Sequence, residues 1–151
     1  MLQDDRGELL WSGELLSNKK AAAARADVLL LQLVSGVDDE GFHPEPTEMA
    51  ETALRALALP EIAALKPFLF PEMAIWAARN GYLVAGRADA LAIRDDKIDV
   101  AIDWKSDINP TASVRAAYTG QLRDYLEATD AGRGALVFLS LGEVVWVEPA
   151  V

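Results

Sequence analysis

The stretch Val100-Ala101-Ile102-Asp103-Trp104-Lys105 decides the fold that this sequence predicts. Side chains on a β-strand point alternately to the two faces of a sheet. On a strand from Ile98 to Lys105, four apolar side chains therefore point one way, whereas Asp103 and Lys105 share the other face. Burying an acid and an amine costs free energy unless the two are paired or bind a ligand. The stretch thus predicts a strand that carries a functional charge pair.

Two further strands are expected before this one, at residues 69–78 and 82–93. The Asn80-Gly81 dipeptide between them is a hairpin signal, because it readily adopts the positive φ angles of a type I′ turn. Pro71 favours an edge position for the first strand. A polar turn at 94–97 leads into the strand that ends at Lys105. These segments are expected to form a three-stranded antiparallel meander.

A helix is expected to follow, from Val114 to about Thr129, with Ser113 as its N-cap and Gly132 near its end. Short apolar strands follow at 136–139 and 144–147. A strand, a crossover helix and another strand together predict that the first of these runs parallel to a strand of the meander.

Helices are also expected in the N-terminal part of the chain. Residues 19–35 are rich in alanine and leucine, which favour helix. A second helix is expected at 48–59, with Thr47 as its N-cap, and a short third helix at 61–65. The tryptophans are expected to pack, and they include Trp11, Trp76 and Trp146.

The composition bounds the class of protein. The chain has 151 residues, 52% hydrophobic and 25% charged, which is typical of one globular domain. We expect a helical part over 1–67 and an α/β core over 68–148.

The absence of cysteine excludes disulfides and thiolate zinc sites. The formal net charge of −10 argues against a self-sufficient nucleic-acid binder. No leader or long apolar run is visible, which favours a cytoplasmic protein without a membrane partner.

Acidic side chains of the three strands are expected to converge. One face of the second strand is expected to carry Leu83, Ala85, Arg87, Asp89 and Leu91. Counting outward from the turn at 94–97, Asp89 lies roughly opposite residues 101–103, so Asp89 and Asp103 can lie within a cross-strand reach of about 5–8 Å. Glu72, on the first strand, is expected near Asp89.

Such a cluster predicts a metal site. Crowded carboxylates repel one another and raise one another's pKa, and a divalent cation relieves that repulsion. Mg²⁺ or Mn²⁺ prefers oxygen ligands of this kind and commonly binds a phosphate as well. Lys105 would then orient water and stabilise the charge that develops on a phosphate during phosphodiester hydrolysis.

Three segments resemble the motifs of the PD-(D/E)xK nuclease superfamily, most closely the RecB/AddA-type nuclease domain that ends bacterial helicase–nucleases. They are Gly86-Arg87-Ala88-Asp89, Ile102-Asp103-Trp104-Lys105-Ser106 and Tyr118-Thr119-Gly120-Gln121-Leu122-Arg123-Asp124-Tyr125. Their order matches G-x-x-D, a strand that ends in D-Y-K-T, and Y-x-x-Q-L-x-x-Y on a helix. The resemblance spans about residues 68–148 and implies an α/β, restriction-endonuclease-like core.

The resemblance also implies roles for individual residues. The metal ligands would be Asp89, Asp103 and the backbone carbonyl of Trp104, together with Glu72 on the preceding strand. Lys105 would be the catalytic lysine, and Gln121 would border the site. Candidate DNA contacts are Arg115, Arg123 and Tyr125. Alternatives stay open for several of them, because Glu72 fits an exposed strand acid, the arginines fit a solvated face, and Tyr118, Leu122 and Tyr125 fit an ordinary apolar stripe.

The resemblance implies a Mg²⁺- or Mn²⁺-dependent exodeoxyribonuclease of DNA repair or recombination. Its substrate would be a single-stranded DNA end delivered by a helicase or a partner nuclease subunit in the bacterial cytoplasm. The family usually has a histidine ligand on its first helix, but residues 25–32 hold none, and the sole histidine is His43 in a predicted loop. One alternative is a catalytically inactive nuclease-fold module with a structural or protein-interaction role. Another is a hydrolase of a smaller phosphate substrate.

Overall fold

The computed structural model of the chain describes residues 20, 23–24, 45–79 and 82–150. The chain divides into two compact units, Met1–Ala58 and Leu59–Val151, and the sheet belongs to the second. Most of the predicted helix at 19–35 and the whole of the chain before it lie outside the described residues. None of the helices in the described ranges is long and apolar enough to cross a membrane.

The first unit contributes one well-described helix, α3, which runs from Pro46 to Ala58. The sequence predicted Thr47 as the N-cap, and this is wrong, because Thr47 lies inside the first turn. Proline suits the first position of a helix, since its φ is already helical and its missing N–H has no partner there. The helix therefore begins at the proline, and the backbone carbonyl of Glu45 accepts the first turn's hydrogen bond from Met49 at 3.1 Å.

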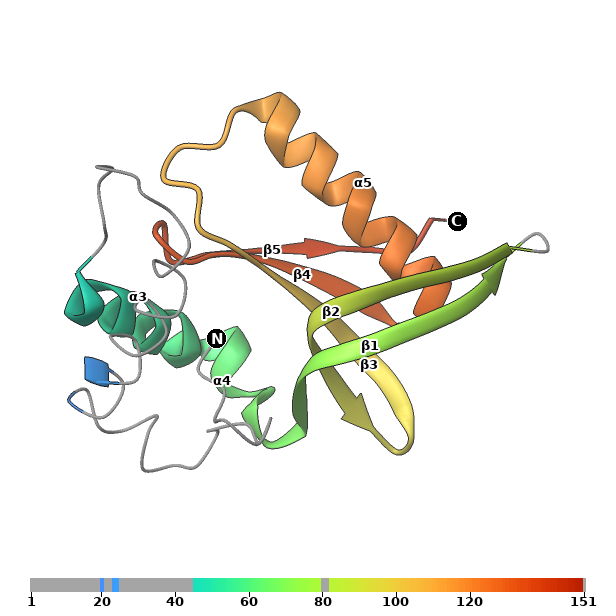
Figure 1. The fold of residues 1–151 in the computed structure, drawn as a ribbon, viewed down its shortest axis with the longest axis horizontal. Helices are drawn as coiled ribbons and strands as arrows, with labels where there is room; N and C mark the ends of the chain where they lie inside the picture. Colours follow the sequence, from blue (N-terminus) through green and yellow to red (C-terminus); the bar gives the residue numbers. More distant parts are fainter. Residues whose placement is uncertain (1–19, 21–22, 25–44, 80–81, 151) are drawn as a thin grey trace, which may run out of the picture. The chain divides into compact units, whose positions relative to one another are not determined.

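The second unit is a mixed α/β structure with a five-stranded sheet in the spatial order β1-β2-β3-β4-β5 (Figure 1). The strands are β1 (Leu69–Arg79), β2 (Tyr82–Arg94), β3 (Lys97–Lys105), β4 (Arg133–Phe138) and β5 (Glu143–Val147). Only β3 and β4 pair in parallel. The antiparallel meander and the parallel crossover are therefore confirmed, as is the edge position of β1. Before β1 come a four-residue helix, α4 (Pro60–Ala63), and the 3-10 helix η1 (Lys66–Phe68).

The turn between β2 and β3 is built by two aspartates. Asp95 and Asp96 both have positive φ angles, of 50° and 59°. Successive positive φ angles are those of a type I′ turn, whose twist matches the twist of the flanking strands. The sequence predicted that turn type at Asn80-Gly81, which lies outside the described residues, although β1 and β2 do form a hairpin through the pair Arg79 and Tyr82.

The crossover helix is α5 (Ala112–Thr129), which lies against one face of the sheet (Figure 1). Its N-cap is Thr111, whose Oγ1 accepts a hydrogen bond from the Val114 N–H at 3.3 Å. The predicted cap Ser113 is wrong, because that residue is already helical and its hydroxyl pairs with that of Thr111 at 2.9 Å. The helix ends at Asp130 with a φ of 53°, since aspartate tolerates the left-handed conformation better than most residues.

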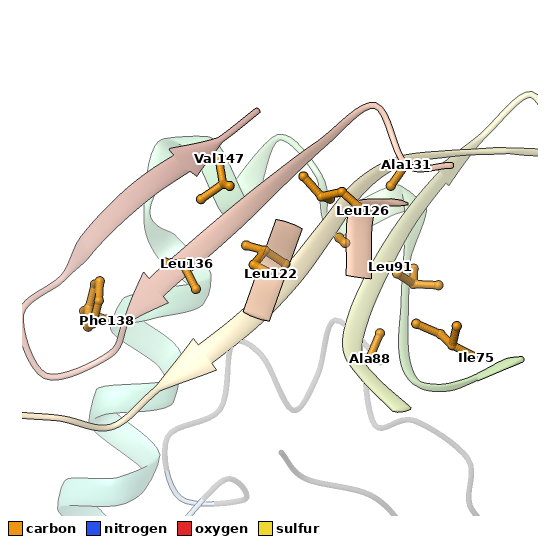
Figure 2. Packing of buried hydrophobic residues seen from close by; sticks show 10 residues of the cluster. Ile75, Ala88, Leu91, Leu122, Leu126, Ala131, Leu136, Phe138 and Val147 are labelled. Atoms are coloured by element: carbon orange, nitrogen blue, oxygen red, sulfur yellow. The ribbon is translucent and has the colours of Figure 1, made fainter. Parts of the chain in front are cut away.

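An apolar cluster joins α5 to the sheet (Figure 2). Its buried members are Ile75, Ala88, Leu91, Ala101, Leu122, Leu126, Ala131, Leu136, Phe138 and Val147. Leu122 and Leu126 stand one turn apart on α5 and are each 1% exposed. Burying one such side chain stabilises the fold by about 1.5–3 kcal/mol. This stripe fixes the helix on the sheet, and with it the distance from the polar residues of α5 to the end of β3.

Gly134 on β4 lies where α5 packs most closely on the sheet. A Cβ atom there would stand 2.6 Å from Cδ2 and 2.7 Å from Cγ of Leu122. We expect Gly134→Ala to lower the free energy of unfolding by about 1–3 kcal/mol through overpacking, measured by urea denaturation. The matched control is Gly120→Ala on α5, where a Cβ meets nothing within 4 Å. The free energy of unfolding of this control should rise by up to about 1 kcal/mol, because alanine favours helix more than glycine does. Equal urea midpoints for the two variants would contradict the prediction.

Trp76 departs from its predicted role. Its side chain on the edge strand β1 is 68% exposed, so the prediction that it packs is wrong. Trp146 does make a packing contact, with the Arg133 guanidinium 3.9 Å above its ring. Trp11 lies outside the described residues.

Candidate metal centre

Asp103 and Lys105 lie at the C-terminal end of β3, on the face that α5 covers. Ala101, two residues earlier on that face, belongs to the cluster packed against α5. Lys105 Nζ lies 2.8 Å from Asp103 Oδ2, and the two side chains are only 14% and 17% exposed. The folded chain thus brings the two charges of the strand together in a mostly buried ion pair.

Asp89 reaches the same place from β2. The ladder between β2 and β3 ends at the pair Ala90 and Ile102. One residue further, Asp89 Oδ2 accepts a hydrogen bond from the backbone N–H of Trp104 at 2.9 Å. This side-chain hydrogen bond takes the place of the next backbone hydrogen bond between the two strands. It holds Asp89 close to Asp103, as predicted by counting residues from the turn at 94–97.

Strict alternation does not hold through this part of β2. Ala88 and Leu91 both belong to the cluster against α5 (Figure 2), although they lie three positions apart and strict alternation would place them on opposite faces. On β1, the residue facing Asp89 in the register is Glu72, which has a φ of 52°. The prediction that strict alternation governs Arg87, Asp89 and Leu91 is therefore wrong, because the hairpin is irregular at this level.

The Asp103 carboxyl lies in an electrostatic environment that disfavours its charged form. Burial raises the pKa of its carboxyl, the neighbouring Lys105 lowers it, and Asp89 raises it, with a net result above the ordinary value. Its Oδ2 is fully buried and, among the described residues, has no hydrogen-bond partner. Its ionic partner is the Lys105 ammonium, 2.8 Å away. Two carboxylates and one ammonium in a mostly buried place leave one negative charge uncompensated, which favours a cationic ligand at this position.

A cavity of about 310 Å³ opens over these groups. Its size lies within the range of small-ligand sites. Six of the predicted site residues line it, namely Asp89, Asp103, Trp104, Lys105, Gln121 and Tyr125. The three sequence segments that carry the resemblance therefore meet at one concave surface between β2, β3 and α5.

Tyr125 both packs and borders the cavity. Its hydroxyl donates a hydrogen bond to the Arg87 backbone carbonyl at 3.2 Å. A Cβ at Gly86 would stand 3.2 Å from that hydroxyl and 3.3 Å from Cε1 of the ring. The glycine of Gly86-Arg87-Ala88-Asp89 thus lets α5 approach β2 closely.

Three predicted residues lie outside the lining of the cavity. The Glu72 carboxylate pairs with Arg87 Nε at 2.8 Å. Arg115 donates to both carboxylate oxygens of Glu143, at 3.1 and 2.8 Å, which lowers the pKa of Glu143. Arg123 is exposed. Glu72 is therefore paired with a residue of β2, and Arg115 is paired with a residue of β5.

The donor set fits a hard divalent cation held by few protein ligands. Within the described ranges, no group of three or more acidic or histidine side chains could hold a metal ion. Asp89 and Asp103 remain as a pair of carboxylates, and Trp104 lines the same cavity. Mg²⁺ is commonly bound by one or two carboxylates and keeps several waters. His43 and residues 25–32 lie outside the described residues.

The sequence interpretation missed a role for Tyr118 and Asp107. Lys105 Nζ lies 4.1 Å from the centroid of the Tyr118 ring. The Tyr118 hydroxyl donates a hydrogen bond to Asp107 Oδ2 at 3.0 Å. Two sequence features could have indicated these residues. Tyr118 stands three residues before Gln121 and so lies on the same side of the helix. Asp107 follows Lys105 by two residues, just after the end of the strand.

The comparisons with known proteins leave the family open. No protein-family model matches the chain, and neither does any curated protein. A solved structure described as "Crystal structure of SSO0001" is 19% identical, with a TM-score of 0.47. The match covers 92% of this chain and 67% of that one. A likeness at this level identifies neither family nor function.

Proposed function

We propose that this protein is a divalent-cation-dependent deoxyribonuclease of the PD-(D/E)xK type, with a restriction-endonuclease-like core similar to the RecB/AddA nuclease domain. The observation that carries the proposal is the meeting of Asp89, Asp103 and Lys105 at one cavity. An ordinary surface ion pair needs neither a second carboxylate nor burial. The raised pKa of Asp103, caused first by burial and also by the neighbouring Asp89, adds to this support.

In the proposed site, Asp89 and Asp103 would hold a Mg²⁺ or Mn²⁺ ion, joined by the Trp104 backbone carbonyl. When bound, the cation would polarise the phosphate and lower the pKa of a water molecule. The hydrogen bond from the Trp104 N–H keeps Asp89 in place for this role. Lys105 supplies a fixed positive charge for the phosphate oxygens as their negative charge grows. Gln121 borders the cavity and is exposed, so it is available to orient the nucleotide.

The charge of the chain bears on how DNA would reach the site. A formal net charge of −10 provides no general attraction for a phosphate backbone. We therefore propose that a helicase or a partner nuclease subunit delivers a single-stranded end, as in bacterial repair and recombination in the cytoplasm. An inactive nuclease-fold module is the second candidate, and the lack of histidine in residues 25–32 favours it.

The test is cleavage of a labelled single-stranded oligonucleotide by the full chain, with Mg²⁺ or Mn²⁺ titrated and with EDTA as the control. We expect cleavage only when the cation is present. Cation-dependent thermal stabilisation without cleavage would assign the inactive module. Neither cleavage nor stabilisation with either cation would refute the nuclease proposal.

The cation should stabilise the wild-type protein but not Asp89→Asn. A ligand at 100 times its Kd stabilises the folded state by about 2.7 kcal/mol, which a thermal shift detects. The asparagine keeps an oxygen that accepts the Trp104 N–H, so the variant retains the bond that ends the ladder while losing the charge. An equal thermal shift in both proteins would contradict the assignment of Asp89 as a ligand.

A further inference from the structure

We propose that Tyr118 is a positioning residue for Lys105. The ring of Tyr118 confines the lysine ammonium, and Asp107 holds the ring through its hydroxyl. The catalytic consequence rests on the proposed function, whereas the contacts themselves can be tested without it.

The lysine is held from two sides by different elements. Its Nζ lies 2.8 Å from Asp103 Oδ2 on β3 and 4.1 Å from the Tyr118 ring centroid on α5. A lysine side chain has a flexible four-carbon stem with many rotamers. A catalytic group must be kept within about 0.5 Å of its productive position. The ion pair alone leaves the ammonium free to swing about the carboxylate, and the ring removes that freedom.

The ring is itself fixed. Its hydroxyl donates to Asp107 Oδ2 at 3.0 Å, in the loop that follows β3. Its other neighbour is Phe138, with ring centroids 6.5 Å apart and planes inclined at 44°. Phe138 is fully buried and is the β4 partner of Lys105 in the parallel register. Strand pairing and a hydrogen bond thus set where the ring stands relative to the lysine.

The contact has the character of a cation–π interaction in a poorly solvated place. Such interactions are stronger when the cation is desolvated than when it is exposed to water. Lys105 is only 14% exposed, so its contact with the ring is of the stronger kind. The competing interpretation is that Tyr118 only fills space between α5 and β4, in which case the position of the ammonium would not depend on it.

The experiment compares Tyr118→Leu, Tyr118→Phe and Asp107→Asn in steady-state cleavage assays with saturating cation. Tyr118→Leu removes the ring and should lower kcat by about 10–100-fold, since misplacing a reacting group by 1 Å can cost about 10²-fold. KM should change little, because DNA binding is not the function assigned to the ring. Tyr118→Phe keeps the ring, and Asp107→Asn keeps an oxygen that can accept the hydrogen bond from the Tyr118 hydroxyl. The kcat of both variants should therefore stay within about fivefold of the wild-type value.

The matched control is Phe68→Leu. The Arg94 guanidinium lies 4.3 Å from the ring centroid of Phe68, which makes a second cation–π contact. Phe68 belongs to the same unit of the chain as Tyr118 but does not line the cavity. This variant should keep the wild-type kcat. A Tyr118→Leu kcat equal to that of wild type would overturn the proposal, and so would equal losses in the leucine and phenylalanine variants.

A second measurement is independent of activity. The Hε protons of Lys105 should show an upfield ring-current shift by NMR in the wild type and in Tyr118→Phe, and lose it in Tyr118→Leu. Absence of that shift from the wild type would overturn the positioning role. If the wild type shows the shift but cleaves nothing, the proposed nuclease function fails and the lysine–ring contact stands.

Discussion

Lys105→Met is expected to lower kcat for phosphodiester cleavage by about 10²–10⁴-fold, the usual contribution of a positioned proton donor or charge. The same change should lower the free energy of unfolding by about 3–5 kcal/mol, because it leaves a buried carboxylate without its cation. The side chains of Lys105 and Asp103 are 14% and 17% exposed, so water screens the loss only weakly. Single-turnover cleavage and urea denaturation measure the two effects separately.

Lys97→Met is the matched control for this change. Lys97 stands at the other end of β3 and is exposed. Its replacement should leave kcat unchanged and alter stability by at most about 0.5 kcal/mol. Wild-type kcat in Lys105→Met would refute the catalytic role of the lysine, and unchanged stability would show that the ion pair is solvated.

Asp103→Asn is expected to abolish cation-dependent cleavage, and the stability of the cation-free variant relative to wild type is expected to rise as the pH increases from about 4 to neutral. The folded state raises the pKa of Asp103 above its unfolded value, with burial as the largest cause. A raised folded pKa means that ionisation destabilises the fold: the cost is absent below the unfolded pKa and complete above the folded pKa. Asparagine cannot ionise and avoids this cost.

The measurement is thermal unfolding of both proteins in EDTA across that pH range, followed by titration of Mg²⁺. The wild type should gain stability from the cation, and Asp103→Asn should not. A stability of the cation-free Asn variant, relative to wild type, that falls as the pH rises toward neutral would contradict the prediction. It would mean that ionisation of Asp103 stabilises the fold without any cation, which removes a main support for the metal centre.

Much of the sheet could be predicted from sequence because its signals are local. The period-two pattern at Ile98–Lys105 defines a strand wherever that strand lies, and a turn between two such patterns defines a hairpin. The crossover helix then requires a parallel neighbour for β3, which is β4. The helix starts were predicted less well, because adjacent polar residues compete for the cap. Thr111 rather than Ser113 took that role, since only one hydroxyl lies where the first free N–H groups point.

The sequence by itself therefore determined the strand from 98 to 105, its hairpin partner, and the meeting of Asp89 with Asp103. Only the tertiary structure decided which of the other charges stand beside that pair. Glu72 pairs with Arg87, and Arg115 pairs with Glu143, so these ions neutralise each other locally. Lys105 came to lie over Tyr118 because Leu122 and Leu126 fix how α5 docks on the sheet. Side-chain partners of this kind depend on distances between elements far apart in the chain, which no local pattern encodes.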